Sequence, residues 1–391
     1  MAEVETQCAR LRTTIAAAKS PSPTTPHDPL ETRRKVIEWT NIAARFPSNT
    51  GGGGILGALP DERVAMRFRQ RMEAMSAGEI IATLDEITAL DLPAGARADL
   101  ERTLLNALVQ KDPALALGLM ADRSVLESSL YSHLASGALQ AWAKMDSMAA
   151  GAWFDEQIAA GKFKSTQLDG VSGYRQMFES ALIAILLTSS PDAAARRVAV
   201  LPEDQRGDVL HMYALSMVPP EIQVAHAGLV RAQVPTKDQA ETIASQLTNL
   251  VKHGDYSAAT AYLDRISATP AERAASAMIA IRDMNPITPN SGKLSREDFD
   301  ALREWVGSQS SESVDKVTAE ALATGANGDH KITFAAAADL AVEYGAQSGN
   351  DEVLAVFLTS YAARRNKAVA RDLAAKIADE TRRAEILNFL K

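Results

Sequence analysis

The stretch ALVQKDPALALGL, residues 107–119, decides the fold class. It ends one apolar helix, turns at Asp112 and opens an Ala-rich helix almost at once. A single pair of helices buries only one face, and stacking such pairs makes a continuous core. Small Ala side chains let neighbouring helices approach closely. Two further stretches share the arrangement: AWAKMDSMAAGAW at 141–153 and NLVKHGDYSAATAYL at 249–263.

A polar anchor residue marks the turn of each unit. Asp or Asn at a turn accepts hydrogen bonds from the free N–H groups that open the next helix, and Pro suits the first helical position. Most anchors lie roughly 30 to 45 residues apart, which is the range of helical repeats. The alternative is a non-repetitive helical bundle in which Asp-capped helices recur by chance. The anchors are Asp112, Asp146, Pro191, Asp255 and Asn366, with Pro220 and Asp329 as poorer members.

The chain from residue 61 onward is predicted to be entirely helical. Ala, Leu, Glu, Arg and Met dominate there, and these are good helix formers. Breaks between the helical stretches are short and polar, which makes neighbouring helices antiparallel. We therefore expect an all-α protein, in which residues 61–391 form stacked antiparallel helical hairpins, an α-solenoid or superhelical repeat array. A sub-boundary is possible near residues 285–293, where NPITPNSGK interrupts the helices.

The first 60 residues are expected to form a flexible N-terminal arm with short helices. Residues 20–29, SPSPTTPHDP, contain four prolines, and Pro removes backbone donors and fixes φ. PSNTGGGG at 47–54 ends the second short helical stretch with consecutive glycines, which carry a high ordering entropy. Both segments read as linkers.

Charge and cysteine content exclude several classes of protein. The 391 residues include 41 Lys and Arg and 49 Asp and Glu, a net charge of −8. This acidity argues against a general affinity for nucleic acid. The single cysteine, Cys8, excludes an internal disulfide or a thiolate metal site. No apolar run approaches the roughly 20 residues of a membrane span. We expect a cytoplasmic protein, or an exported one if a leader was removed upstream of Met1.

Motif searches give no sign of catalysis or of a cofactor. Gly52, Gly54 and Gly57 match G-x-G-x-x-G, but no strand precedes them as a dinucleotide site requires. None of the six histidines lies one helical turn from another, so no single helix presents a metal pair. The acidic cluster at residues 297–304 follows Ser295 and reads as the start of a helix, where carboxylates favour the dipole. We expect no catalytic residues, no cofactor and no metal.

Two groups of residues are candidates for an interaction surface. Arg63, Arg67 and Arg71 recur every four residues and form a basic stripe on one helix face, with a plain solvated face as the alternative. Trp142 and Trp153 lie on either side of the turn at Asp146. Trp is enriched at binding hot spots, and packing within the hairpin is the alternative.

One unit of the repeat resembles a known family. GDYSAATAYLDRI, residues 254–266, is similar to the second half of a tetratricopeptide unit, and the spacing of about 34 to 37 residues is similar as well. The resemblance covers about half of the chain. It implies a superhelical scaffold that binds other proteins.

The sequence therefore predicts a non-catalytic scaffold for protein–protein interaction, built from degenerate helical repeats, with an unidentified protein or peptide as its partner. Nucleic acid is not expected as a partner, and no membrane span is expected. One alternative is an enzyme or small-ligand binder whose site is assembled from distant helices. Another is an exported structural protein associated with the cell envelope.

Overall fold

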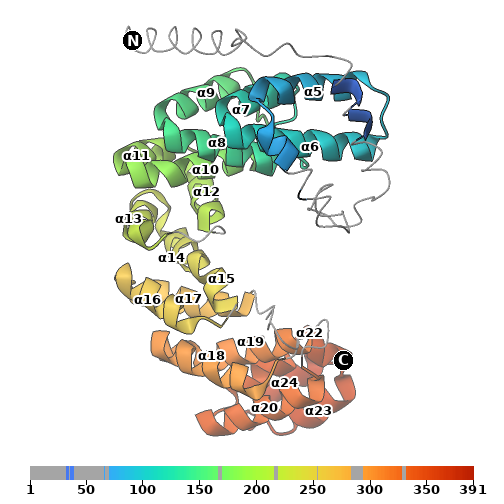
Figure 1. The fold of residues 1–391 in the computed structure, drawn as a ribbon. Coiled ribbons are helices and arrows are strands. Elements are labelled where there is room, and N and C mark those ends of the chain that lie inside the picture. The colour runs from blue at the N-terminus through green and yellow to red at the C-terminus, as the bar shows by residue number, and fades with distance from the viewer. Residues whose placement is uncertain are drawn as a thin grey trace. The chain divides into compact units, whose positions relative to one another are not determined.

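The protein is helical throughout the part of the chain that its computed structural model describes (Figure 1). Every regular element there is an α-helix or a short 3-10 helix, without a strand, which confirms the prediction of an all-α protein. Helix labels follow Figure 1 and begin at α5. The described residues are 32–34, 36–38, 66, 70–165, 170–214, 219–252, 254–282, 294–327 and 332–391.

The chain divides into two compact units, residues 1–186 and 187–391. The boundary lies within α10 (Gly173–Ser189). Apart from residues 32–34 and 36–38, the predicted arm at 1–60 lies outside the described residues, and so does the possible sub-boundary at 285–293.

In the first unit, helices that follow one another in the chain pack on one another. α6 packs on α5, α7 and α8, and α8 packs on α7 and α9. Leu100, Leu104 and Leu108 recur every fourth residue along α6 and are buried, which is the pattern of an amphipathic helix facing a core. Besides α10, the helices are α5 (Ala77–Ala89), α6 (Ala94–Lys111), α7 (Pro113–Asp122), α8 (Ser132–Met145) and α9 (Ser147–Ala159).

Three phenylalanines close the core of this unit after α9. The ring centroids of Phe163 and Phe178 lie 4.8 Å apart, and Phe154 lies 5.3 and 5.6 Å from them. Phe163 has a φ of 62°, a left-handed conformation that costs energy for a bulky side chain. Its backbone N–H donates to the carboxylate of Glu127, and its ring is buried. Aromatic packing and this hydrogen bond together hold the chain in its turn toward α10.

The second unit continues the same mode of packing. α13 packs on α12, α14 and α16, α17 packs on α14, α18 and α19, and α21 packs on α19, α20 and α22 to α24. Among the described residues of each unit, the α-helices that pack closely on one another are at most three α-helices apart along the chain. The elements are α11 (Pro191–Ala199), α12 (Glu203–Ala214), η1 (Pro220–Ile222), α13 (Gln223–Gln233), α14 (Thr236–Ala244), η2 (Ser245–Leu247), α15 (Thr248–Lys252), α16 (Tyr256–Arg265), α17 (Pro270–Arg282), α18 (Arg296–Gln309), η3 (Ser311–Ser313), α19 (Val314–Ala326), α20 (Phe334–Ser348), α21 (Glu352–Leu358), α22 (Tyr361–Arg365), α23 (Lys367–Ala374) and α24 (Glu380–Phe389).

Three predicted turn residues are helix N-caps. The carboxylate of Asp112 accepts a hydrogen bond of 2.9 Å from the backbone N–H of Leu115 and starts α7. The carboxylates of Asp146 and Asp255 do the same at the starts of α9 and α16. These contacts confirm the capping role that the sequence predicts for the three aspartates.

The other anchors differ from the three aspartates. Pro191 is the first residue of α11, as a proline at a helix start should be. Asn366 precedes α23 without a side-chain cap, and its amide instead donates to the carbonyl of Ala362. Pro220 opens the short helix η1. Asp329 lies outside the described residues.

We predict that Asp146→Ala lowers the free energy of unfolding by about 1 kcal/mol, because it removes the acceptor for the first N–H groups of α9. Asp146→Asn is the matched control, since Asn caps helices about as well as Asp. Urea unfolding followed by circular dichroism measures both. Equal stability of the Ala variant and the unchanged protein would contradict the capping role.

Candidate functional site

The basic stripe predicted at the start of the helical region is only partly described. Arg63 and Arg67 lie outside the described residues. The Arg71 side chain is exposed, and its Nη1 lies 3.6 Å from an Oε2 of Glu38, which is also exposed. Such an exposed ion pair adds little stability. The stripe as an interaction surface stays a prediction.

Trp142 and Trp153 face each other across the α8–α9 hairpin. Their ring centroids lie 6.0 Å apart, with 57° between the ring planes. Trp142 is 8% exposed and Trp153 is 6% exposed, so little of either ring is available to a partner. Packing within the hairpin, which the sequence left open as the alternative, describes these positions. A role in binding stays a prediction.

The acidic cluster after Ser295 serves the start of α18. Ser295 is the N-cap, and its hydroxyl accepts from the backbone N–H of Asp298 at 3.3 Å. The carboxylate of Asp298 accepts from the backbone N–H of Ser295 at 2.8 Å, which completes a capping box. The glycines of the G-x-G-x-x-G match lie outside the described residues.

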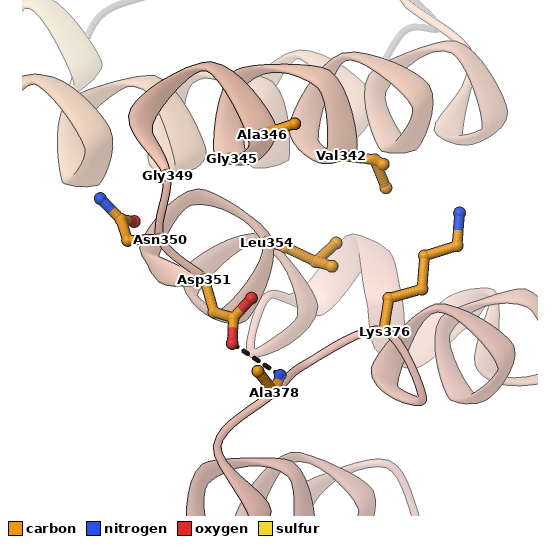
Figure 2. A pocket seen from close by; sticks show the side chains of 9 residues that line it. All are labelled: Val342, Gly345, Ala346, Gly349, Asn350, Asp351, Leu354, Lys376 and Ala378. Atoms are coloured by element: carbon orange, nitrogen blue, oxygen red, sulfur yellow. Dashed lines mark hydrogen bonds between the residues drawn. The ribbon is translucent and has the colours of Figure 1, made fainter.

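An open pocket of about 360 Å³ lies in the second unit at the α20–α21 corner (Figure 2). Its apolar part comes from Val342, Ala346 and Leu354. Figure 2 shows Lys376 extending across the opening toward α20, while Asp351 points the other way, toward Ala378. The pocket therefore presents one ammonium group over a small apolar floor.

The corner beside the pocket requires two glycines. Gly349 ends α20 with a φ of 68°, a left-handed conformation that favours glycine. A Cβ on Gly345 would lie 3.2 Å from the carbonyl oxygen of Asn350, a tight contact that glycine avoids at this close return of the chain. The carboxylate of Asp351 is already engaged, because it accepts from the backbone N–H of Ala378 at 2.7 Å. The pocket residues thus shape a corner rather than present a reactive group.

A polar network behind this corner centres on Asp315 of α19. Its Oδ1 accepts from the hydroxyl of Ser348 at 2.5 Å, and its Oδ2 accepts from the amide of Asn350 at 2.9 Å. Arg303 of α18 places Nη2 3.4 Å from the same carboxylate and donates through Nη1 to Thr318 at 2.9 Å. The network joins α18, α19 and the end of α20.

The same arginine also contacts an aromatic ring. The guanidinium carbon of Arg303 lies 4.6 Å from the centroid of Tyr344, whose hydroxyl donates to Asp300 at 2.8 Å. Burial, followed by the hydrogen bond to Asp300, raises the pKa of Tyr344 above its ordinary range. Every polar group named here has a partner inside the unit, which is typical of a network that fixes helix positions.

A second polar group lies inside the unit at His226 of α13. The imidazole is fully buried, with Nε2 3.4 Å from the carbonyl oxygen of Leu210 and 3.5 Å from the amide nitrogen of Gln246. Burial lowers the pKa of His226 to about 4, although the hydrogen bond with Leu210 acts in the opposite direction. The side chain is therefore neutral at pH 7.

An ion pair between a partly exposed arginine and a buried glutamate joins α13 to α17. Arg231 donates to Glu272 through Nε at 2.8 Å and through Nη2 at 2.7 Å, and a third hydrogen bond reaches the carbonyl of Ile266. Burial alone would raise the pKa of Glu272, but the bonds from Arg231 and Thr269 outweigh it and hold the pKa below its usual value. The hydroxyl of Tyr262 is buried in the same region of the unit. This pair has the geometry of a structural clamp.

No group of three or more His, Cys, Asp or Glu side chains gathers closely enough to hold a metal ion within the described residues. Among the same residues, no helix combines the length and the apolar character that a membrane crossing requires.

The buried histidine, the Asp315 network and the Arg231–Glu272 pair could not be located from the sequence. Each depends on residues from separate helices, and none carries a local motif.

We predict that His226 makes the protein less stable in mild acid. The unfolded chain binds a proton below about pH 6.5, whereas the folded chain does so only near pH 4, so stability falls as the pH drops between these values. Through this residue alone, the free energy of unfolding falls by about 2 kcal/mol between pH 7 and pH 5. His226→Gln removes that dependence, which urea unfolding at both pH values measures.

The matched control is His211→Gln, which changes an exposed histidine of α12. It should leave the pH dependence as it is in the unchanged protein. An equal loss of stability between pH 7 and pH 5 in the His226 variant and in the unchanged protein would show that His226 does not carry this effect.

Comparison with known proteins leaves the function to be argued from these residues, because no protein-family model, no curated protein sequence and no solved structure matches the chain.

Proposed function

We propose that this protein is a non-catalytic scaffold that binds a protein or peptide partner, and that its helices stack as a degenerate repeat array. One observation carries the proposal. In each unit, every closely packed pair of described α-helices lies within three α-helices along the chain. Repeat proteins pack in this order, and they use the outer surface of the stacked helices for binding.

The helix caps support the repeat part of the proposal. Asp112, Asp146 and Asp255 each start the second helix of a pair, α6–α7, α8–α9 and α15–α16. The last pair contains residues 254–266, the segment that resembles a tetratricopeptide unit. An aspartate N-cap at the turn of three helix pairs is a feature that repeats of one ancestral helix pair would share.

The pocket at the α20–α21 corner favours a scaffold over an enzyme. An enzyme site assembled from distant helices would bring together several titratable groups in an enclosed cavity. This pocket is open and is lined by one carboxylate and no histidine, and that carboxylate is engaged with Ala378. The net charge of −8 favours a protein partner over nucleic acid.

Affinity capture from the native organism tests the proposal. The full-length protein, carrying a photo-crosslinking side chain at an exposed helix position, is recovered after irradiation, and its adducts are identified by mass spectrometry. We expect one or a few proteins that crosslink reproducibly at exposed positions and not at buried ones. A parallel screen of metabolites by thermal shift covers the enzyme alternative. A specific small-molecule ligand together with an absence of protein adducts would overturn the proposal.

A further inference from the structure

The last helices of the chain present an exposed basic surface, here called the C-terminal basic face. It consists of Tyr361, Arg364 and Arg365 of α22 and of Lys367 and Arg371 of α23, all exposed. Residues one turn apart lie on the same helix face, so Tyr361, Arg364 and Arg365 point outward together. The opposite face of α22 is buried through Ala362 and Ala363.

Three of these cations converge on the end of α24. The guanidinium carbon of Arg364 lies 4.2 Å from the ring centroid of Phe389. Arg371 donates through Nη2 to the carbonyl of Leu390 at 3.1 Å, and Lys367 donates through Nζ to the carbonyl of Lys391 at 2.7 Å. Three positive charges on two helices are thereby brought to one place.

None of the four cations forms an ion pair with an Asp or Glu side chain among the described residues. Arg231, Arg296 and Arg382 of the same unit each form an ion pair with a glutamate. Arg364 and Arg371 contact a ring and a carbonyl, Lys367 contacts the backbone oxygen of the final residue, and Arg365 has no described contact. The negative end of α24 neutralises part of this charge. A surplus of positive charge remains.

Most guanidinium N–H donors on this face also have no described acceptor. A guanidinium carries five N–H donors, and Arg371 uses one of them on a described partner. Arg364 lies over a ring and has no described hydrogen bond to an acceptor. Free N–H edges of this kind bind a carboxylate with two parallel hydrogen bonds. The face therefore has both the charge and the geometry to take carboxylates.

The face also differs in charge from the rest of the chain. Between Ser360 and Lys391 there are eight Lys and Arg and four Asp and Glu, whereas the whole chain has a net charge of −8. Tyr361 adds an apolar element next to the arginines, because this residue is 61% exposed. An exposed aromatic beside unpaired arginines is a common composition of a binding hot spot.

We propose that the C-terminal basic face binds an acidic segment of a partner protein, with its carboxylates on Arg364, Arg365, Lys367 and Arg371 and an apolar side chain on Tyr361. This inference rests on the proposed scaffold function and names the chemistry of the partner. Nucleic acid and anionic membranes are less suited, since the face occupies two short helices and the net negative charge of the protein repels a long polyanion.

The test uses the full-length protein and a fluorescein-labelled peptide of glutamates around one tryptophan, with binding followed by fluorescence anisotropy at low salt. The double variant Arg364→Glu/Arg365→Glu should weaken binding by about tenfold or more, because it removes the charge that attracts the peptide. The control is Lys144→Glu/Arg196→Glu, which reverses two exposed charges that also lie in last helical turns. It changes the net charge equally and should bind like the unchanged protein.

A second variant and two further ligands complete the binding experiment. Arg364→Gln/Arg365→Gln serves as a second variant if the reversed one fails to fold by circular dichroism, and it should also bind more weakly. Absence of peptide binding to the unchanged protein overturns the inference. So does equal weakening by the control variant, or equally tight binding of a single-stranded oligonucleotide or of phosphatidylserine vesicles.

The scaffold proposal and this inference fail separately. If the Arg364→Glu/Arg365→Glu variant crosslinks to the same proteins as the unchanged protein, the scaffold function stands and its binding surface lies elsewhere. Crosslinked proteins that are lost in this variant and kept in the Lys144→Glu/Arg196→Glu control would support both.

Discussion

The burial of each helix against helices that are near it in the chain is the constraint on which this protein depends. Ala-rich faces let the helices approach closely, and neighbours in sequence become neighbours in space. Leu100, Leu104 and Leu108 of α6 show the local form of this constraint, since their spacing leaves one apolar stripe that α5, α7 and α8 cover. The turns then decide where each helix starts, and an aspartate at three of them supplies the acceptor that the first N–H groups need.

The sequence predicts the local features of this fold well because local residues determine them. The all-helical class follows from helix-forming residues separated by short polar breaks, and the caps at Asp112, Asp146 and Asp255 follow from position and side-chain chemistry. The Asp315 network could not be predicted in this way. Its carboxylate meets Arg303 and Asn350 only after α18, α19 and α20 have packed, and nothing in the sequence spacing marks these residues as partners.

The same limit applies to the candidate surfaces. A tryptophan pair around a turn is compatible with a hot spot and, more readily, with packing, and the choice depends on exposure, which the sequence does not contain. Conversely, the proposal for the C-terminal basic face rests on four ordinary cations that form no ion pair with an Asp or Glu side chain among the described residues. Arg364 and Arg382 look alike in the sequence. Only the contacts separate a cation over a phenylalanine ring from one that is bound to Glu352.

Packing in chain order also bears on how this protein reaches its folded state. Contacts between elements near in sequence need little loop closure, so the search for them is short. During synthesis, a helix meets its partners within the next few helices and does not wait for distant segments. α14, for example, packs most extensively on α17, so part of its apolar face stays exposed until α17 has been made.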